Sequence, residues 1–187
     1  HGYSHNSSQS PGLIFEIESN GTSLARSDES TRLLRHPGYA SGPEPLPNYR
    51  LPESNVCFDA RAEIGAWTLP SFGDAHWHRP RLAGALPAAP WGRLVPRPIP
   101  LWKTGDVVGY VDAPATPFLS DGSTIVCKLP FNLQLTPWLD VEGPAGRVID
   151  IRTDNYEGGQ EKNLRATYTT RDGRQQYESL GWMNGHE

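Results

Sequence analysis

Three histidines have the chemistry and the spacing to bind a metal ion. An N-terminal histidine such as His1 can chelate copper through its α-amine and its imidazole. His76 and His78 flank Trp77, and residues two apart in a strand share a face. This pair could therefore complete a copper site with His1, or bind zinc or copper alone. The alternative is that all three are histidines without a ligand.

The tryptophans offer a second chemistry, the recognition of sugars. The apolar face of a sugar ring suits an aromatic plane, and the chain has six tryptophans. Trp102 ends a proline-rich stretch, and Trp138 follows Pro137 in a sequence context that favours exposure. We therefore predict that Trp102 and Trp138 bind carbohydrate, with packing in a core or a domain contact as the alternative.

Oxygen ligands and two sequons complete the set of candidate sites. Asp154 and Asn155 precede a Gly-Gly pair, so their side-chain oxygens are the candidate ligands of a Ca²⁺ ion, and no other cofactor is expected. Asn6 and Asn20 begin Asn-X-Ser/Thr tripeptides and are candidate N-glycosylation sites of a secreted protein. The sequence shows no glycine-rich phosphate loop and no nucleophile elbow, so nothing indicates phosphoryl transfer or serine-based hydrolysis.

Composition excludes several classes of protein. The formal net charge of −4 and the isoelectric point near 5.9 argue against a nucleic-acid surface, which needs a basic excess. No apolar run reaches the length of about 18 residues that a membrane-spanning helix requires, so no membrane partner is expected. The two cysteines, Cys57 and Cys127, either pair in an oxidising compartment or remain buried free thiols.

Short strands separated by turns must position these residues. The 19 glycines and 18 prolines argue against a helix-rich protein, because each interrupts regular structure. Asn20-Gly21 and Asp172-Gly173 predict hairpin turns, the second joining strands near 164–170 and 175–180. This pattern predicts an all-β fold, an antiparallel β-sandwich. The predicted strands are 13–18, Val107–Val111, Thr124–Leu129, Val148–Thr153, Leu164–Thr170 and Gln175–Leu180.

Proline content divides the chain into three parts. Residues 36–54 are rich in proline and are predicted to be a loop. Residues 80–104 are also proline-rich and are predicted to be a stiff connector. We expect residues 1–79 to be the C-terminal part of a first β-sandwich and residues 105–187 to be a second, truncated sandwich.

Several runs of residues resemble one family of enzymes. Residues 58–61 read Phe-Asp-Ala-Arg, and residues 65–77 read Gly-Ala-Trp-Thr-Leu-Pro-Ser-Phe-Gly-Asp-Ala-His-Trp. Further runs follow in order at 89–94, 97–100, 146–151, 154–156, 168–178 and 179–186. Their order and spacing resemble the accessory β-sandwich region of bacterial and fungal α-L-rhamnosidases, which precedes an (α/α)₆ catalytic barrel.

This resemblance implies a portion of a secreted glycoside hydrolase that acts on α-L-rhamnosides. Glycoside hydrolysis normally needs two carboxyl groups across the bond, and none of the 21 acidic residues matches the family's catalytic motifs. We therefore predict no catalytic residue in this chain, which would be an interior fragment that buttresses the barrel. Its expected partners are rhamnose-containing glycans, reached through the parent enzyme, and the catalytic barrel or other chains that supply missing strands.

Two other functions remain open at this point. The first is a stand-alone carbohydrate-binding module that uses exposed tryptophans. The second is a copper-dependent polysaccharide monooxygenase built on His1, a secreted class that is also a β-sandwich. A metal bound at His1 would favour the second, and sugar binding without turnover would favour the first.

Overall fold

The computed structural model shows a protein built from short strands. It describes residues 12–41, 56–85, 103–154, 166–181 and 183–186, and residues 87, 89, 92, 93, 95, 96 and 98–101 of the proline-rich connector. These residues form ten strands and one 3₁₀ turn, with no α-helix among them. The predicted all-β class is confirmed. No helix in the described part of the chain is long and apolar enough to cross a membrane.

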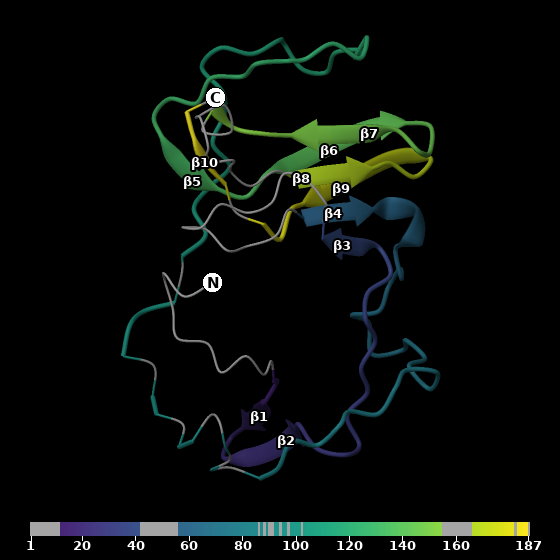
Figure 1. The fold of residues 1–187 in the computed structure, drawn as a ribbon, viewed down its shortest axis with the longest axis vertical. Coiled ribbons are helices and arrows are strands. Elements are labelled where there is room, and N and C mark those ends of the chain that lie inside the picture. The colour runs from purple at the N-terminus through teal and green to yellow at the C-terminus, as the bar shows by residue number, and fades with distance from the viewer. Residues whose placement is uncertain are drawn as a thin grey trace.

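Four sheets contain the ten strands (Figure 1). The largest has the order β3-β4-β8-β7, and the others are the pairs β6-β9, β5-β10 and β1-β2. All pairs are antiparallel except β4 with β8, which is parallel and departs from the predicted antiparallel sandwich. The bounds are β1 Glu16–Ser19, β2 Thr22–Arg26, β3 Tyr39–Ser41, β4 Val56–Asp59, η1 Ala60–Ala62, β5 Leu133–Leu135, β6 Trp138–Gly143, β7 Val148–Ile151, β8 Ala166–Thr169, β9 Gly173–Glu178 and β10 Met183–Gly185.

Aromatic rings fill the space between the β6-β9 pair and the four-stranded sheet. Tyr177 of β9 stacks on Phe58 of β4, with ring centroids 5.0 Å apart and planes 7° from parallel. Its ring also contacts Tyr168 of β8 at 4.6 Å. Because these side chains come from two different sheets, the two layers pack face to face. Burial of the rings raises the pKa of Tyr177 to about 12.

The predicted hairpin at Asp172-Gly173 is wrong in its pairing, although both of its strands exist. β8 pairs with β7 and β4, whereas β9 pairs with β6, so the turn carries the chain from one layer to the other. The side chain of Gln175 explains the difference. Its amide accepts from the backbone N–H of Arg171 at 2.8 Å and donates to the carbonyls of Arg171 and Gly173 at 2.8 and 2.7 Å. These bonds satisfy turn groups that hairpin pairing would otherwise satisfy.

Other local predictions had mixed outcomes. The Asn20-Gly21 hairpin is confirmed: φ is 51° at Asn20 and 74° at Gly21, and the turn joins β1 to β2. The predicted strands at 107–111 and 124–129 are wrong. Residues 107–129 contain one isolated bridge, between Asp112 and Lys128. Their apolar side chains pack against no sheet, and Val107 is 80% exposed. Strand β3 forms inside the predicted loop of residues 36–54.

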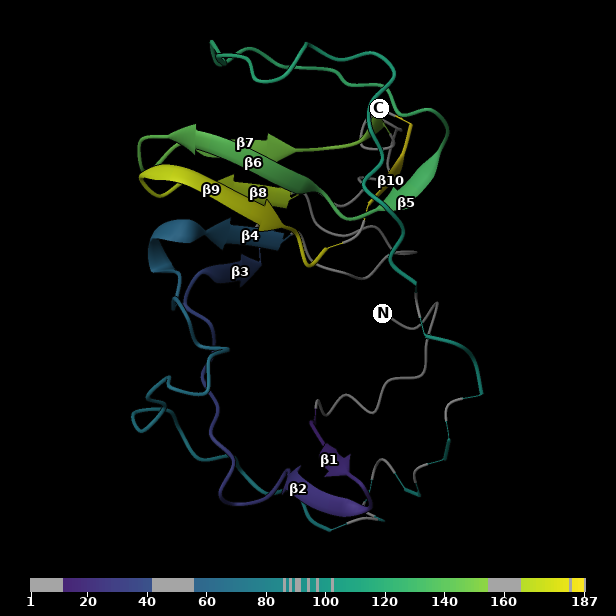
Figure 2. The same ribbon diagram turned by 180° about the vertical axis from the view of Figure 1, so that it is seen from behind.

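The four-stranded sheet joins segments from both sides of the proline-rich connector. β3 and β4 precede the connector in the sequence, and β7 and β8 follow it. Figures 1 and 2 show these strands together with β6 and β9, while the β1-β2 hairpin lies apart from them. The predicted division at residues 79 and 104 stays a prediction, but strand pairing crosses it through β4 and β8.

A candidate carbohydrate-binding face

The outward-facing side of the β6-β9 pair carries a row of polar side chains and one tryptophan. Along β6 the side chains alternate between exposed and half-buried, and the exposed positions begin at Trp138. The antiparallel register places each exposed residue of β6 opposite an exposed residue of β9. We call these six residues the β6-β9 outer face: Trp138 opposite Glu178, Asp140 opposite Gln176, and Glu142 opposite Arg174.

Trp138 forms the apolar part of this face. The residue is 48% exposed, and Glu178 lies directly across from it on β9. One carboxylate oxygen of Glu178 accepts a hydrogen bond from the hydroxyl of Thr136 at 3.0 Å, which limits the movement of the carboxylate. Trp138 therefore offers an aromatic surface with a fixed hydrogen-bond acceptor beside it.

Asp140 organises the polar part of the face. Arg174 donates to both oxygens of its carboxylate, from Nε at 3.0 Å and from Nη2 at 2.8 Å. Gln176 donates from Nε2 to the same carboxylate at 3.1 Å. These hydrogen bonds, with Arg174 the larger cause, lower the pKa of Asp140 to about 2. The carboxylate is therefore ionised at every pH at which the protein is expected to work.

The chemistry of this face suits the recognition of a sugar. A pyranose ring has an apolar face that can stack on Trp138 and hydroxyl groups at its edge. The carboxylates accept hydrogen bonds, and the amide of Gln176 can donate and accept them. Because Arg174, Gln176 and Glu178 are already held by neighbouring groups, little side-chain entropy is lost when a ligand binds.

The other predicted sites have different outcomes. Trp102, Asn155, Asn6 and His1 lie outside the described residues. Asp154 accepts the backbone N–H of His186 at 2.9 Å, so it holds the C-terminal strand β10 beside its loop. The predicted Ca²⁺ site stays a prediction; no group of three histidine, cysteine or acidic residues suited to a metal ion occurs in the part of the chain that the structure describes.

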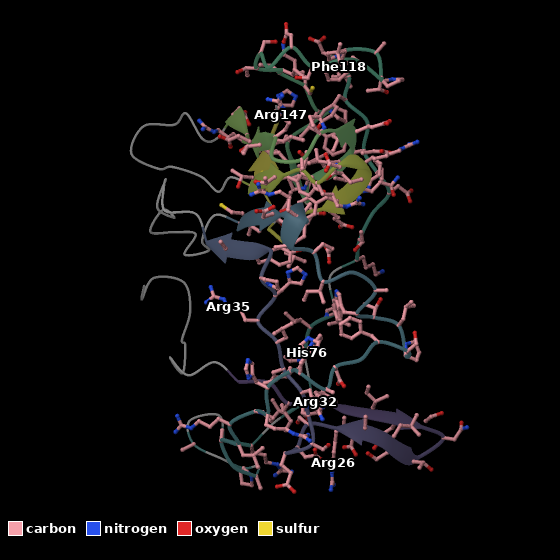
Figure 3. The ribbon with its side chains drawn as sticks, turned by 90° about the vertical axis from the view of Figure 1, so that its right-hand side faces the viewer. Arg26, Arg32, Arg35, His76, Phe118 and Arg147 are labelled. Atoms are coloured by element: carbon pink, nitrogen blue, oxygen red, sulfur yellow. The ribbon has the colours of Figure 1, made fainter. Side chains whose placement is uncertain are left out.

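The remaining candidates lie outside the β6-β9 outer face. Asn20 is exposed in the β1-β2 turn, which leaves its sequon accessible. His78 forms an isolated bridge with Leu33, and Figure 3 shows His76 in the same part of the molecule as Arg32. Cys57 and Cys127 are free thiols, as in the second alternative left open by the sequence, but both are half-buried and not buried.

The Phe-Asp-Ala-Arg run of the family resemblance has a structural role. Phe58 and Ala60 are buried in the core. Arg61 donates to both oxygens of Asp59, at 2.9 and 2.7 Å, and Asp59 caps the short η1 turn through the backbone N–H of Arg61. These charged side chains are therefore engaged with each other beside the sheet, and they do not belong to the β6-β9 outer face.

Sequence reasoning found Trp138 but missed its polar neighbours. Asp140, Arg174, Gln176 and Glu178 were not among the predicted site residues. Part of the signal was present, because residues 139–142 and 176–178 alternate between apolar and polar side chains. What the sequence does not show is that the two segments pair in this register.

No known protein family, curated protein or solved structure matches this chain. We therefore infer function from the geometry of the β6-β9 outer face and from the resemblance of the short sequence runs described above.

Proposed function

We propose that this chain is a non-catalytic β-sandwich portion of a secreted glycoside hydrolase acting on α-L-rhamnosides, and that it holds the glycan on the β6-β9 outer face. In this proposal the chain also buttresses a catalytic barrel that carries out the hydrolysis. The observation that carries the proposal is the exposed Trp138 beside an ordered row of hydrogen-bonding side chains. The order of the short motifs supports the choice of rhamnosides as ligands.

The electrostatics of the face support binding and not catalysis. A glycosidase needs one carboxyl group that stays protonated long enough to act as a general acid, which requires a raised pKa. Asp140 is shifted in the opposite direction, because Arg174 and Gln176 stabilise its ionised form. A carboxylate held in a bidentate pair with arginine is a good positioning element and a poor proton donor.

A stand-alone carbohydrate-binding module is the second candidate function. The same observation favours it, because Trp138 and its neighbours need no second domain to contact a sugar. The two proposals differ in the partner: the first requires a catalytic barrel and the second does not. Co-purification of the chain with a barrel from its source would favour the first.

A binding experiment with a matched pair of tryptophan variants tests both proposals. Isothermal titration of the folded chain with an α-L-rhamnoside should give measurable binding, and a chromogenic α-L-rhamnoside should not be hydrolysed. Trp138→Ala should weaken binding roughly tenfold, since an aromatic contact contributes about 1 kcal/mol or more. Trp67→Ala is the control, because Trp67 is also 48% exposed but lies outside the β6-β9 outer face.

Three results would contradict the proposal. One is binding that is equally strong in the Trp138→Ala and Trp67→Ala variants. Another is rhamnoside hydrolysis above background that disappears when an acidic residue of this chain is changed. The third is the absence of any glycan binding by the folded chain.

A further inference from the structure

The charges of the β6-β9 outer face are unbalanced. Three of its six residues are acidic, Asp140, Glu142 and Glu178, and one is basic, Arg174. Three negative charges and one positive charge leave a net charge of −2 on a single side of two short strands. The formal net charge of the whole chain is −4, so the net charge of this face equals half of it.

The single cation on the face is not free to neutralise a ligand. Arg174 donates Nε and Nη2 to Asp140 in a bidentate pair, so most of its charge is already compensated. A ligand carboxylate near this pair would have to compete with Asp140, whose pKa of about 2 reflects how strongly it holds the guanidinium. An acidic ligand would therefore meet uncompensated negative charge.

The position of Glu178 decides where this repulsion would act. Cross-strand neighbours have Cβ atoms about 5 Å apart, so a sugar stacked on Trp138 has the Glu178 carboxylate at its edge. A carboxylate accepts hydrogen bonds and donates none. It therefore matches the hydroxyl groups of a neutral sugar and repels the carboxylate of a uronic acid. Rhamnose is a neutral 6-deoxy sugar, and its methyl group adds an apolar contact for the tryptophan.

We propose that the β6-β9 outer face selects uncharged rhamnosides and rejects glycans in which rhamnose alternates with uronic acid residues. This inference rests on the proposed function, because it specifies which rhamnose-containing glycans the face binds. The selection comes from Glu178, whose cross-strand neighbour is Trp138 and not a basic residue, and from the net charge of −2 on the face. Glu142 lies opposite Arg174, but Arg174 is already engaged in its bidentate pair with Asp140. The neutral rhamnoside is held by stacking on Trp138 and by hydrogen bonds from its hydroxyl groups.

The test compares two oligosaccharides of equal length by isothermal titration. One contains only neutral rhamnose, and the other alternates rhamnose with galacturonic acid. At low ionic strength the neutral oligosaccharide should bind about tenfold more tightly or better. At about 1 M salt the screening length falls to about 3 Å, so the difference should shrink.

A matched pair of charge variants identifies the source of the selectivity. Glu142→Lys changes the net charge of the face from −2 to 0 and should reduce the preference for the neutral oligosaccharide. Glu18→Lys changes the charge of the whole chain by the same amount but lies on β1, apart from this face (Figure 1). It should leave the preference unchanged.

The outcomes separate this inference from the proposed function. Equal or tighter binding of the acidic oligosaccharide, together with binding of the neutral one, would overturn the inference and leave the proposed function intact. The same effect of Glu18→Lys and Glu142→Lys would also overturn it. Failure of the folded chain to bind either oligosaccharide would overturn the proposed function and the inference together.

Discussion

Gln175 stabilises the turn that carries the chain between the two layers, and replacing it should be costly. The residue is 3% exposed. Besides its three hydrogen bonds to the turn backbone, its Oε1 accepts from the hydroxyl of Tyr168 at 3.0 Å. Gln175→Met keeps a similar length and volume but removes all four hydrogen bonds. The variant therefore tests hydrogen bonding and not the loss of packing.

The expected loss of stability depends on whether each hydrogen-bond partner of Gln175 stays buried or can bond to water instead. The Tyr168 hydroxyl is buried and would lose its acceptor, at a cost of about 1–3 kcal/mol. The backbone groups of Arg171 and Gly173 lie at exposed positions, where water can replace the lost bonds at about 0.5–1 kcal/mol each. The methionine side chain returns about 1 kcal/mol through its apolar burial. We expect a net loss of about 3 kcal/mol in the free energy of unfolding.

Urea unfolding followed by tryptophan fluorescence measures this loss. For a urea dependence of about 2 kcal/mol per molar, the midpoint should fall by about 1–2 M. Gln176→Met is the control: it is the next residue, it is exposed, and it makes one surface hydrogen bond to Asp140, so it should cost less than about 0.5 kcal/mol. Equal costs for the two variants would refute the role assigned to Gln175.

Three further predictions concern the core, the C-terminal strand and pH. Tyr177→Phe should be neutral or stabilising in urea unfolding, because the buried Tyr177 hydroxyl makes no hydrogen bond of normal geometry in the described structure. Tyr168→Phe should cost about 1 kcal/mol, because it removes the hydrogen bond from the Tyr168 hydroxyl to Gln175. The reverse order of the two costs would contradict the geometry. Gly185→Ala should destabilise the protein by about 1–3 kcal/mol, because the new Cβ would lie 2.5 Å from a carboxylate oxygen of Asp154. Gly143→Ala is the control: its Cβ would meet nothing within 4 Å, so this variant should unfold like the parent. Asp140 contributes stability that is present above its unfolded pKa near 4 and is lost as the pH falls towards 2. Asp140→Asn should therefore flatten the decline of the urea midpoint between these two pH values. An unchanged decline would argue against the stabilising pair of Asp140 with Arg174.

Local features of the sequence predicted the parts of the fold that depend on one or two residues. The Asn20-Gly21 turn formed as expected, because both residues adopt the positive φ that the turn needs. The strands predicted around Tyr168 and Tyr177 exist as β8 and β9, and each has one buried side. Glycine and proline content, together with short strand segments separated by turns, predicted the all-β class. Each of these inferences depends on backbone dihedrals or on the side-chain period, which neighbouring residues determine.

Pairing partners were not predictable in the same way. A hairpin and a turn between layers place similar demands on Asp172-Gly173, and the choice between them depends on Gln175 and on which strands are available to β8. β8 found a parallel partner, β4, from a segment more than a hundred residues earlier in the sequence. The apolar run at 107–111 had strand propensity but no partner, so it did not join a sheet.

The same distinction, between local sequence and strand pairing, applies to the candidate site. The sequence context of Trp138, which follows Pro137, predicted an exposed side chain, and the residue is 48% exposed. Only the tertiary structure decided what lies beside it. Asp140 and Arg174 are separated by 34 residues, and they meet because β6 and β9 pair in one register out of several that their alternation permits. The charge of the face is a sum over both strands, and it therefore exists only once they are paired.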